Sequence, residues 1–191
     1  MSLCATDKPI FRKLVVLGDG GCGKTSLLNV FTRKYFPQVY EPTIFENYVY
    51  DFTLDGQEIS LSLWDTAGQE EFGRLRTLSY ADTHVIMLCF SVDSRDSLEN
   101  IGNKWIEEVA EHCPNVKIML TALKCDLRDD EPTKLKLARV NDTPLTYEEG
   151  LACARSINAV RYLECSAKHN RGVTECFEQA ARLALTGMHA N

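Results

Sequence analysis

Gly18-Asp19-Gly20-Gly21-Cys22-Gly23-Lys24-Thr25 is the stretch that decides the fold of this chain. It fits the pattern Gly-x-x-x-x-Gly-Lys-[Ser/Thr], a P-loop whose backbone N–H groups cradle phosphate oxygens. An aliphatic run at residues 14–17 precedes it and predicts a buried strand, while Leu27, Val30 and Phe31 follow at helical spacing. Because a helix start adds the positive end of its dipole, this strand, loop and helix predict a polyphosphate site. A glycine-rich turn with an incidental Lys-Thr pair would lack these flanks.

The composition limits the class of protein. A chain of 191 residues favours one α/β domain over two small ones. The net charge of −6, with no basic run of five or more, argues against nucleic-acid binding. The eight cysteines have no C-x-x-C spacing and most lie in apolar runs, as expected in a reducing cytosol. The sequence contains no apolar stretch of membrane-spanning length and no signal-peptide pattern, so we expect a soluble cytoplasmic protein.

Alternating strand and helix signals predict a sheet covered by helices on both faces. Residues 46–54 and 57–64 flank Asp55-Gly56, a hairpin signal that implies one antiparallel edge strand. The remaining strands and helices are predicted at residues 84–92, 97–113, 116–123, 146–156, 160–165 and 173–185. We therefore expect a three-layer α/β domain with a mostly parallel sheet, a frayed tail at residues 1–9 and a surface excursion at residues 128–143.

Parallel sheets of this kind bind ligands at the carboxyl ends of their strands. Polar motifs follow four of the predicted strands, namely the P-loop and residues 65–69, 124–126 and 166–168. We therefore expect these four segments, which are far apart in the sequence, to converge on one rim.

Residues of the P-loop and of the segment 65–69 are each suited to a particular role in binding or hydrolysing a nucleotide. Lys24 can reach the β- and γ-phosphates, and the Thr25 hydroxyl and a strand-end carboxylate such as Asp65 can hold Mg²⁺. Gly68 can bring its N–H close to a γ-phosphate, since no side chain blocks the approach. Gln69 has a donor and an acceptor, which suits the positioning of an attacking water. Without the P-loop, Asp-Thr-Ala-Gly would be an ordinary loop.

Asp126 indicates which base is bound. Its carboxylate matches the N1–H and N2–H₂ donors of guanine, whereas adenine has an acceptor at N1 and no 2-amino group. A Lys-x-Asp sequence alone is often a solvated charge pair, but its place after a predicted strand favours guanine recognition. A P-loop ATPase or small-molecule kinase remains the alternative. Asp126 and the absence of an arginine-rich lid both count against it.

These motifs resemble the set of the Ras superfamily of small GTPases, and the resemblance runs from about residue 13 to residue 185. Within the superfamily, residues 40–48, 78–82 and 97–101 resemble the Rho family, and Trp64 resembles its Rho and Rac branches. The sequence as a whole is similar to those of a fungal Rho subgroup concerned with polarised growth. The resemblance implies a Ras-like G domain over residues 10–187 with a six-stranded sheet, and a Rho insert helix at about residues 128–143.

The resemblance also implies a set of site residues. Catalytic roles fall to Gln69, Lys24 and Gly68, and Mg²⁺ ligation to Thr25, Thr43 and Asp65. The nucleotide contacts implied are Gly20, Gly21, Cys22, Gly23, Lys24, Thr25, Ser26, Phe36, Tyr40, Thr43, Asp65, Gly68, Lys124, Asp126, Leu127, Ser166, Ala167 and Lys168.

As a member of this family the chain would cycle between GTP and GDP, hydrolyse GTP with Mg²⁺, and signal to effectors that control actin and cell polarity. Switch I around Thr43 and switch II at residues 68–80 would meet exchange factors, GTPase-activating proteins, a GDP-dissociation inhibitor and effectors. Family members use Arg74 and Arg76 of switch II for partner contacts. We expect a monomer that binds no nucleic acid.

Two departures qualify the resemblance. Leu123 stands where most relatives have Asn or Thr, and it cannot hydrogen-bond the base or brace the P-loop. A GTP-locked or fast-cycling binding module with little hydrolysis is therefore the alternative, although Gly20 and Gln69, which locked relatives usually alter, are both present. Residues 188–191 end without a polybasic run or a prenylation signal. We expect a truncated chain whose full-length form reaches the inner leaflet of the plasma membrane, with a natively unprenylated protein as the alternative.

Overall fold

The sheet at the centre of the molecule has the strand order β2-β3-β1-β4-β5-β6. The computed structural model describes residues 8–39, 42–43 and 45–186. Within this part of the chain, β2 (Phe45–Leu54) runs antiparallel to β3 (Gln57–Thr66), and the other neighbouring strands are parallel. The predicted six-stranded sheet with one antiparallel edge strand is confirmed.

The other regular elements include those predicted, together with a short helix and two 3₁₀ turns that the sequence did not indicate. In chain order they are β1 (Ile10–Gly18), α1 (Lys24–Arg33), a 3₁₀ turn (Glu70–Phe72), α2 (Gly73–Thr77), β4 (Val85–Ser91), α3 (Arg95–Asn100), a π-helical segment (Ile101–Trp105), α4 (Ile106–His112), β5 (Lys117–Leu123), a 3₁₀ turn (Cys125–Arg128), α5 (Glu131–Ala138), α6 (Tyr147–Ser156), β6 (Arg161–Glu164) and α7 (Val173–Leu185).

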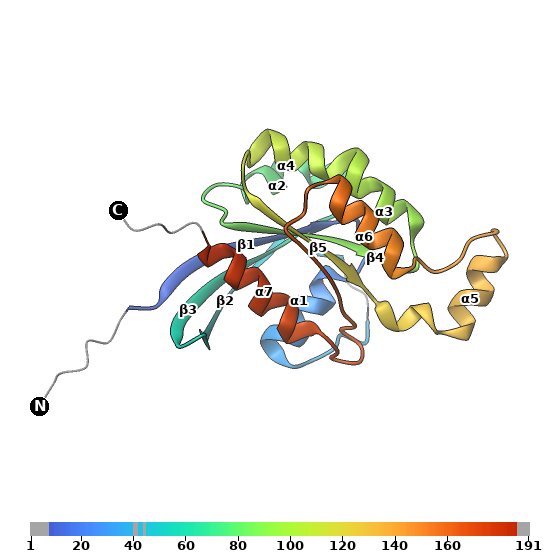
Figure 1. The fold of residues 1–191 in the computed structure, drawn as a ribbon, viewed down its shortest axis with the longest axis horizontal. Coiled ribbons are helices and arrows are strands. Elements are labelled where there is room, and N and C mark those ends of the chain that lie inside the picture. Colours follow the sequence, from blue (N-terminus) through green and yellow to red (C-terminus); the bar gives the residue numbers. More distant parts are fainter. Residues whose placement is uncertain (1–7, 40–41, 44, 187–191) are drawn as a thin grey trace, which may run out of the picture.

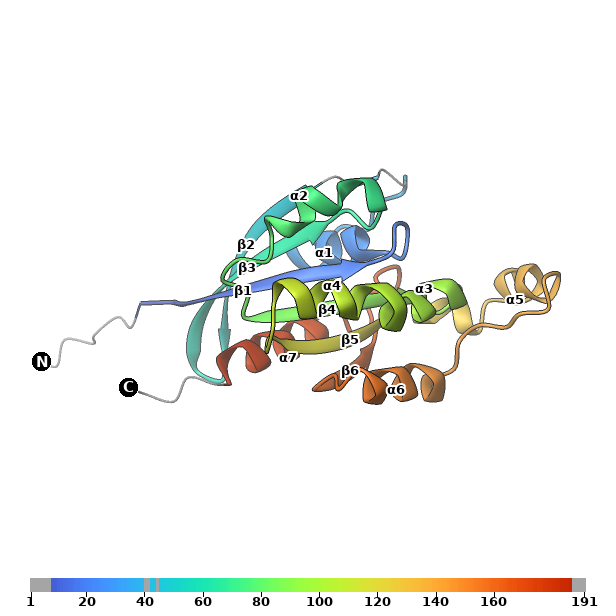
Figure 2. The same ribbon diagram turned by 90° about the horizontal axis from the view of Figure 1, so that it is seen from above.

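Helices cover both faces of the sheet because successive strand residues point to opposite sides. In β1, Leu14 and Val16 belong to the core beneath α1 and α7, whereas Val15 and Leu17 belong to the core on the other face. That second core also takes residues from the α3–α4 helix and from α6. Figures 1 and 2 show the resulting three layers.

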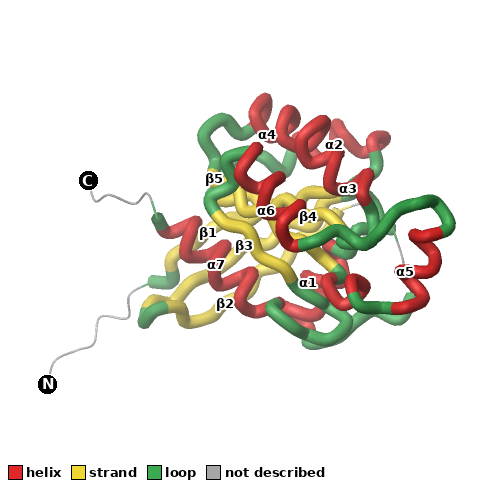
Figure 3. Tube along the Cα trace, turned by 45° about the vertical axis from the view of Figure 1, so that its right-hand side comes forward, coloured by secondary structure: helices red, strands yellow, loops and turns green. Residues whose placement is uncertain are grey.

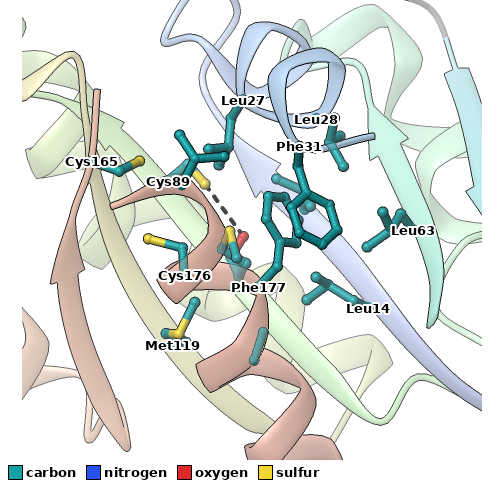
Figure 4. Close-up of a cluster of buried hydrophobic side chains, with 14 of the residues drawn as sticks. Leu14, Leu27, Leu28, Phe31, Leu63, Cys89, Met119, Cys165, Cys176 and Phe177 are labelled. Atoms are coloured by element: carbon teal, nitrogen blue, oxygen red, sulfur yellow. Dashed lines mark hydrogen bonds between the residues drawn. The ribbon is translucent and has the colours of Figure 1, made fainter. Parts of the chain in front are cut away.

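Aromatic stacking ties α1 to α7 on the first face. The Phe31 and Phe177 rings stack with their centroids 4.0 Å apart, among leucines and buried cysteines (Figure 4). Because α1 begins at Lys24, within the P-loop motif, this contact fixes the phosphate-binding segment to the body of the domain.

The predicted helix at residues 97–113 forms, but it is not uniform. Residues 101–105 are π-helical, and the Ile106 N–H donates to the Ile101 carbonyl, five residues back. Such wide turns are rare and often lie at functional sites. Hydrophobic spacing does not reveal this one, because Leu98, Ile101, Trp105 and Val109 keep the three- and four-residue spacing of an ordinary α-helix.

The excursion at residues 128–143 contains the expected insert helix. Asp130 caps α5 by accepting from the Thr133 N–H, and α5 has no buried residue. Figure 3 shows it projecting from the domain. No helix in the described ranges has the length and apolar character needed to cross a membrane. The predicted tails at residues 1–9 and 188–191 fall almost entirely outside those ranges.

Candidate functional site

The four polar segments meet at one rim, at the carboxyl ends of β1, β3, β5 and β6. The hollow at this rim is lined by several of the predicted nucleotide contacts, namely Gly23, Ser26, Phe36, Lys124, Asp126, Leu127, Ala167 and Lys168. A wider cleft also contains Gly20, Gly21, Lys24, Thr25, Thr43, Gly68 and Gln69. Cys22, Asp65 and Ser166 are buried behind this surface. Tyr40 lies outside the described residues.

Glycine conformations build the P-loop between β1 and α1. Gly21 and Gly23 have φ angles of 75° and 111°, which residues with side chains rarely adopt. At Gly18, a Cβ atom would lie 2.1 Å from the Cys89 carbonyl oxygen. The chain can therefore turn from the sheet into α1 over a short distance, and it leaves the first N–H groups of α1 without helical partners at the cleft.

Lys24 supplies a buried cation to the cleft. Its side chain is 5% exposed, and its Nζ donates to the carbonyl oxygens of Gly18 (2.7 Å) and Asp19 (2.8 Å). A desolvated ammonium group with carbonyl partners gains from a nearby anion. Together with the helix start, it makes this end of the cleft suited to phosphate.

Gly68 and Gln69 lie directly against the P-loop. A Cβ atom on Gly68 would be 2.2 Å from the Gly20 nitrogen and 2.5 Å from the Gly18 oxygen, so only glycine fits. The Gln69 side chain lies over Gly20, since a Cβ atom built there would be 3.6 Å from Gln69 Cδ. The amide of Gln69 is thus beside the loop that would hold a terminal phosphate.

Thr25, Thr43 and Asp65 form a set of oxygen donors. The two threonine Oγ1 atoms are 2.5 Å apart. Asp65 is fully buried, and neither of its carboxylate oxygens has a hydrogen-bond partner among the residues described. Burial raises the pKa of Asp65 to about 6, although the nearby Thr25 hydroxyl and Lys24 oppose this shift.

This donor set fits Mg²⁺. Buried polar atoms almost always have partners, so the two unpaired Asp65 oxygens indicate a missing one. The described part of the chain contains no group of three His, Cys, Asp or Glu side chains that could hold a metal ion. Magnesium does not need one, because it is usually bound by one or two carboxylates together with water and phosphate oxygens.

The base side of the rim depends on side chains. Ser166 Oγ donates to Asp126 Oδ1 at 2.5 Å and accepts from the His169 N–H, so the carboxylate has a fixed orientation. Lys124 has a left-handed φ of 57°, and its Cε would lie 3.6 Å from a Cβ atom on Gly23. The lysine stem therefore runs beside the P-loop and forms one wall of the hollow.

Leu123 is buried against the P-loop. Its side chain is 2% exposed, and its Cδ1 would lie 3.7 Å from a Cβ atom on Gly23. At this position the contact between β5 and the P-loop is therefore apolar packing.

Two further ties hold the rim together, and sequence reasoning missed both. Arg128 donates to both carboxylate oxygens of Glu164, at 2.7 and 2.8 Å, and so joins the segments that carry Asp126 and Ser166. The Asp19 carboxylate accepts from Asn100 Nδ2 (2.7 Å) and from Trp105 Nε1 (2.8 Å). No local motif signals these pairs, because their members are 36 to 86 positions apart.

Arg76 differs from its expected role in partner contacts. Its side chain is 3% exposed and faces inward, where it pairs with Glu108. Arg74, in the same helix α2, is exposed as expected. The alternation of exposed and buried arginines could not be read from a five-residue helix.

Comparisons with known proteins show the family of this chain. The Ras family, as described by its sequence model, matches residues 13–186. The GTP-binding protein rho3 of Schizosaccharomyces pombe is 65% identical, over 97% of this chain and 89% of that protein. The GTP-binding protein RHO3 of Saccharomyces cerevisiae is 58% identical, with the same coverage of 97% and 89%. The Rho-related GTP-binding protein RhoB of Homo sapiens is 58% identical, over 92% and 90%. This chain therefore belongs to the Ras family, as a Rho-type small GTPase similar to the fungal Rho3 proteins.

Proposed function

We propose that this GTPase is a Mg²⁺-dependent switch in which Gln69 orients the attacking water and Gly68 senses the γ-phosphate. The observation that carries the proposal is the direct contact of the Gly68-Gln69 segment with the P-loop. A γ-phosphate held by the P-loop would lie against switch II, so its presence would order this segment and its loss would release it.

The residues would divide the chemistry as follows. Lys24 and the P-loop N–H groups would stabilise the charge that develops on the phosphate oxygens. The Gly68 N–H would donate to the γ-phosphate, and the Gln69 amide would hold the water in line. Thr25, Thr43 and Asp65 would hold Mg²⁺, which neutralises charge on the β- and γ-phosphates when bound.

Hydrolysis without a partner should be slow. Within the described residues, Arg33 of the cleft donates to Asn29 and lies over the Tyr48 ring, and Arg76 of switch II pairs with Glu108. Neither is available as an arginine finger in this arrangement. We expect a rate like that of Ras, on the order of 10⁻⁴ to 10⁻³ s⁻¹, which an arginine from an activating protein would accelerate.

Partner proteins would bind switch I and switch II through apolar contacts and so distinguish the GTP-bound from the GDP-bound form. Among the described residues of these segments, the large apolar side chains of Val39, Phe45, Leu75 and Leu78 are exposed. Their exposure supports docking of exchange factors and effectors at this surface. A pull-down with GTP-loaded protein should retain partners that the GDP-loaded form does not.

A fast-cycling module is the second candidate function, and Leu123 is the observation that favours it. Apolar packing replaces an amide between β5 and the P-loop, which weakens the polar connection around the base. Such a protein would still hydrolyse GTP, but nucleotide release would not require an exchange factor. A GTP-locked module is disfavoured because Gly20 and Gln69 are present.

Single-turnover hydrolysis tests the main proposal. Gln69→Leu keeps the size of the side chain but removes its donor and acceptor, so we expect hydrolysis to slow roughly ten- to hundredfold. GTP binding should be unchanged, and Gln57→Leu, at an exposed position in β3, is the control. Wild-type hydrolysis rates in the Gln69 variant would contradict the assignment. Competition of ATP with bound GDP would argue instead for the ATPase alternative.

A further inference from the structure

A buried guanidinium group lies beneath the turn that carries Gly68 and Gln69. Arg76 Nη1 donates to the carbonyl oxygens of Ala67 (2.7 Å) and Gln69 (3.1 Å), which flank Gly68. One nitrogen atom therefore holds both ends of the turn. Since the Gln69 side chain leaves this turn toward Gly20, the position of Arg76 bears directly on the position of the amide.

Glu108 fixes the guanidinium group from the helix behind it. Its carboxylate accepts from Arg76 Nε (2.7 Å) and Nη2 (2.9 Å), and from the Tyr80 hydroxyl (2.5 Å). Burial alone would raise the pKa of Glu108, but the hydrogen bonds from Arg76 and Tyr80 outweigh it and lower this pKa. A two-point contact between planar groups also sets the plane of the arginine.

Trp105 connects the same group to the P-loop. The Arg76 Cζ lies 4.8 Å from the centre of the indole ring. The indole N–H of that ring donates to Asp19 in the P-loop, with Asn100 on the other carboxylate oxygen. The π-helical segment ends at Trp105. The Trp105 ring therefore contacts both Asp19 of the P-loop and the guanidinium group of Arg76.

We propose that Arg76, Glu108 and Trp105 form a positioning unit that holds Gln69 over the P-loop for GTP hydrolysis. The proposal rests on the assigned role of Gln69. None of the three residues lines the cleft, so they are positioning residues that act through the Ala67–Gln69 backbone. Displacing a catalytic group by about 1 Å can slow a reaction about a hundredfold. The positioning unit would therefore affect the rate of hydrolysis although it does not contact the nucleotide.

Single-turnover GTP hydrolysis by Glu108→Gln is the main test. The amide keeps the shape of the side chain but loses the charge and one acceptor for the arginine. We expect hydrolysis to slow about tenfold while GDP release changes less than about twofold. Glu107→Gln makes the same chemical change at the next position, which is exposed, and should leave both rates unchanged. Arg76→Lys, which keeps the charge but not the planar fork, should reproduce the loss.

The Gln69→Leu background separates positioning from a general effect on the fold. If the unit acts through Gln69, adding Glu108→Gln to Gln69→Leu should slow hydrolysis less than about twofold further. The assay must therefore resolve rates well below that of the single Gln69 variant. The proposal is overturned if Glu108→Gln hydrolyses GTP at the wild-type rate, if its loss is as large without Gln69, or if GDP release accelerates by the same factor. Failure of Gln69→Leu itself to slow hydrolysis would instead refute the role of Gln69.

Discussion

The phosphate side and the base side of the cleft are built by different means. On the phosphate side, backbone packs on backbone, and a Cβ atom on Gly68 would come within 2.2 to 2.5 Å of three P-loop backbone atoms. On the base side, side chains make the contacts, as in the hydrogen bond from Ser166 to Asp126 and the packing of Leu123 on the P-loop.

This difference predicts how each side tolerates change. Backbone atoms cannot move aside without displacing a whole loop, so the phosphate side should respond sharply to one added methyl group. Side chains can adopt other rotamers and exchange a polar contact for an apolar one. Leu123, which the resemblance to the family marks as a departure at the nucleotide site, lies on the tolerant side.

Gly68→Ala should have the largest effect. The new methyl group would overlap Gly20 and Gly18, so switch II must move off the P-loop. Gln69 would move with it, and we expect single-turnover hydrolysis to fall at least about a hundredfold. GDP affinity should change much less, because GDP has no γ-phosphate to contact this segment.

Gly102→Ala is the matched control. A Cβ atom at Gly102 meets nothing within 4 Å, so its hydrolysis rate should equal that of the wild type. Normal hydrolysis in Gly68→Ala would show that the phosphate side can relax, and the contrast between the two sides would be lost.

Substitutions of Thr25 and Thr43 come next in size. Both hydroxyls lie at the proposed metal site, but Thr25 belongs to α1 and Thr43 to the loop before β2. We expect Thr25→Ala to speed GDP release in Mg²⁺ about ten- to hundredfold, since a contact to a charged group is lost. Thr43→Ala should leave GDP release nearly unchanged and abolish GTP-dependent partner binding. Equal acceleration of GDP release by both variants would contradict this division.

Much of the fold could be predicted because its signals are local. Asp55-Gly56 marks the hairpin, and the Thr146–Glu149 capping box starts α6, the helix predicted at residues 146–156. The convergence of the polar segments followed from topology, since the carboxyl ends of parallel strands share an edge. The P-loop could be predicted from its glycines and Lys24 alone, because these residues are close together in the sequence.

The parts that could not be predicted depend on distant partners. Arg76 reads as a surface residue of a short polar segment, and only Glu108, 32 positions later, explains its burial. Asp19 reads as one variable position of the P-loop, and its partners are Asn100, at the end of α3, and Trp105, at the end of a π-helical segment that no periodicity reveals. Buried polar networks are specified by three-dimensional packing, so the local patterns of a sequence give little access to them.

Leu123→Asn should have the smallest effect of the three, and it tests the base side. An amide at this buried position would face the P-loop beside Gly23, where it could hydrogen-bond the loop and the base. One net hydrogen bond contributes about 0.5–1.5 kcal/mol, which corresponds to a roughly two- to tenfold slower release of GDP. If the amide found no partner in this apolar setting, its desolvation would instead cost about as much free energy as one hydrogen bond contributes.

The measurement is the release rate of fluorescent GDP at fixed Mg²⁺, for wild type and Leu123→Asn. Leu135→Asn, in the exposed helix α5, makes the same change away from the cleft and should not alter release. Slower release from Leu123→Asn alone would show that the leucine sets a fast exchange rate, which supports a fast-cycling switch. Release as fast as the wild type, or faster, would show that the pocket has adapted to Leu123. The base side would then be held by Asp126, Lys124 and the Arg128–Glu164 pair without a contribution from this position.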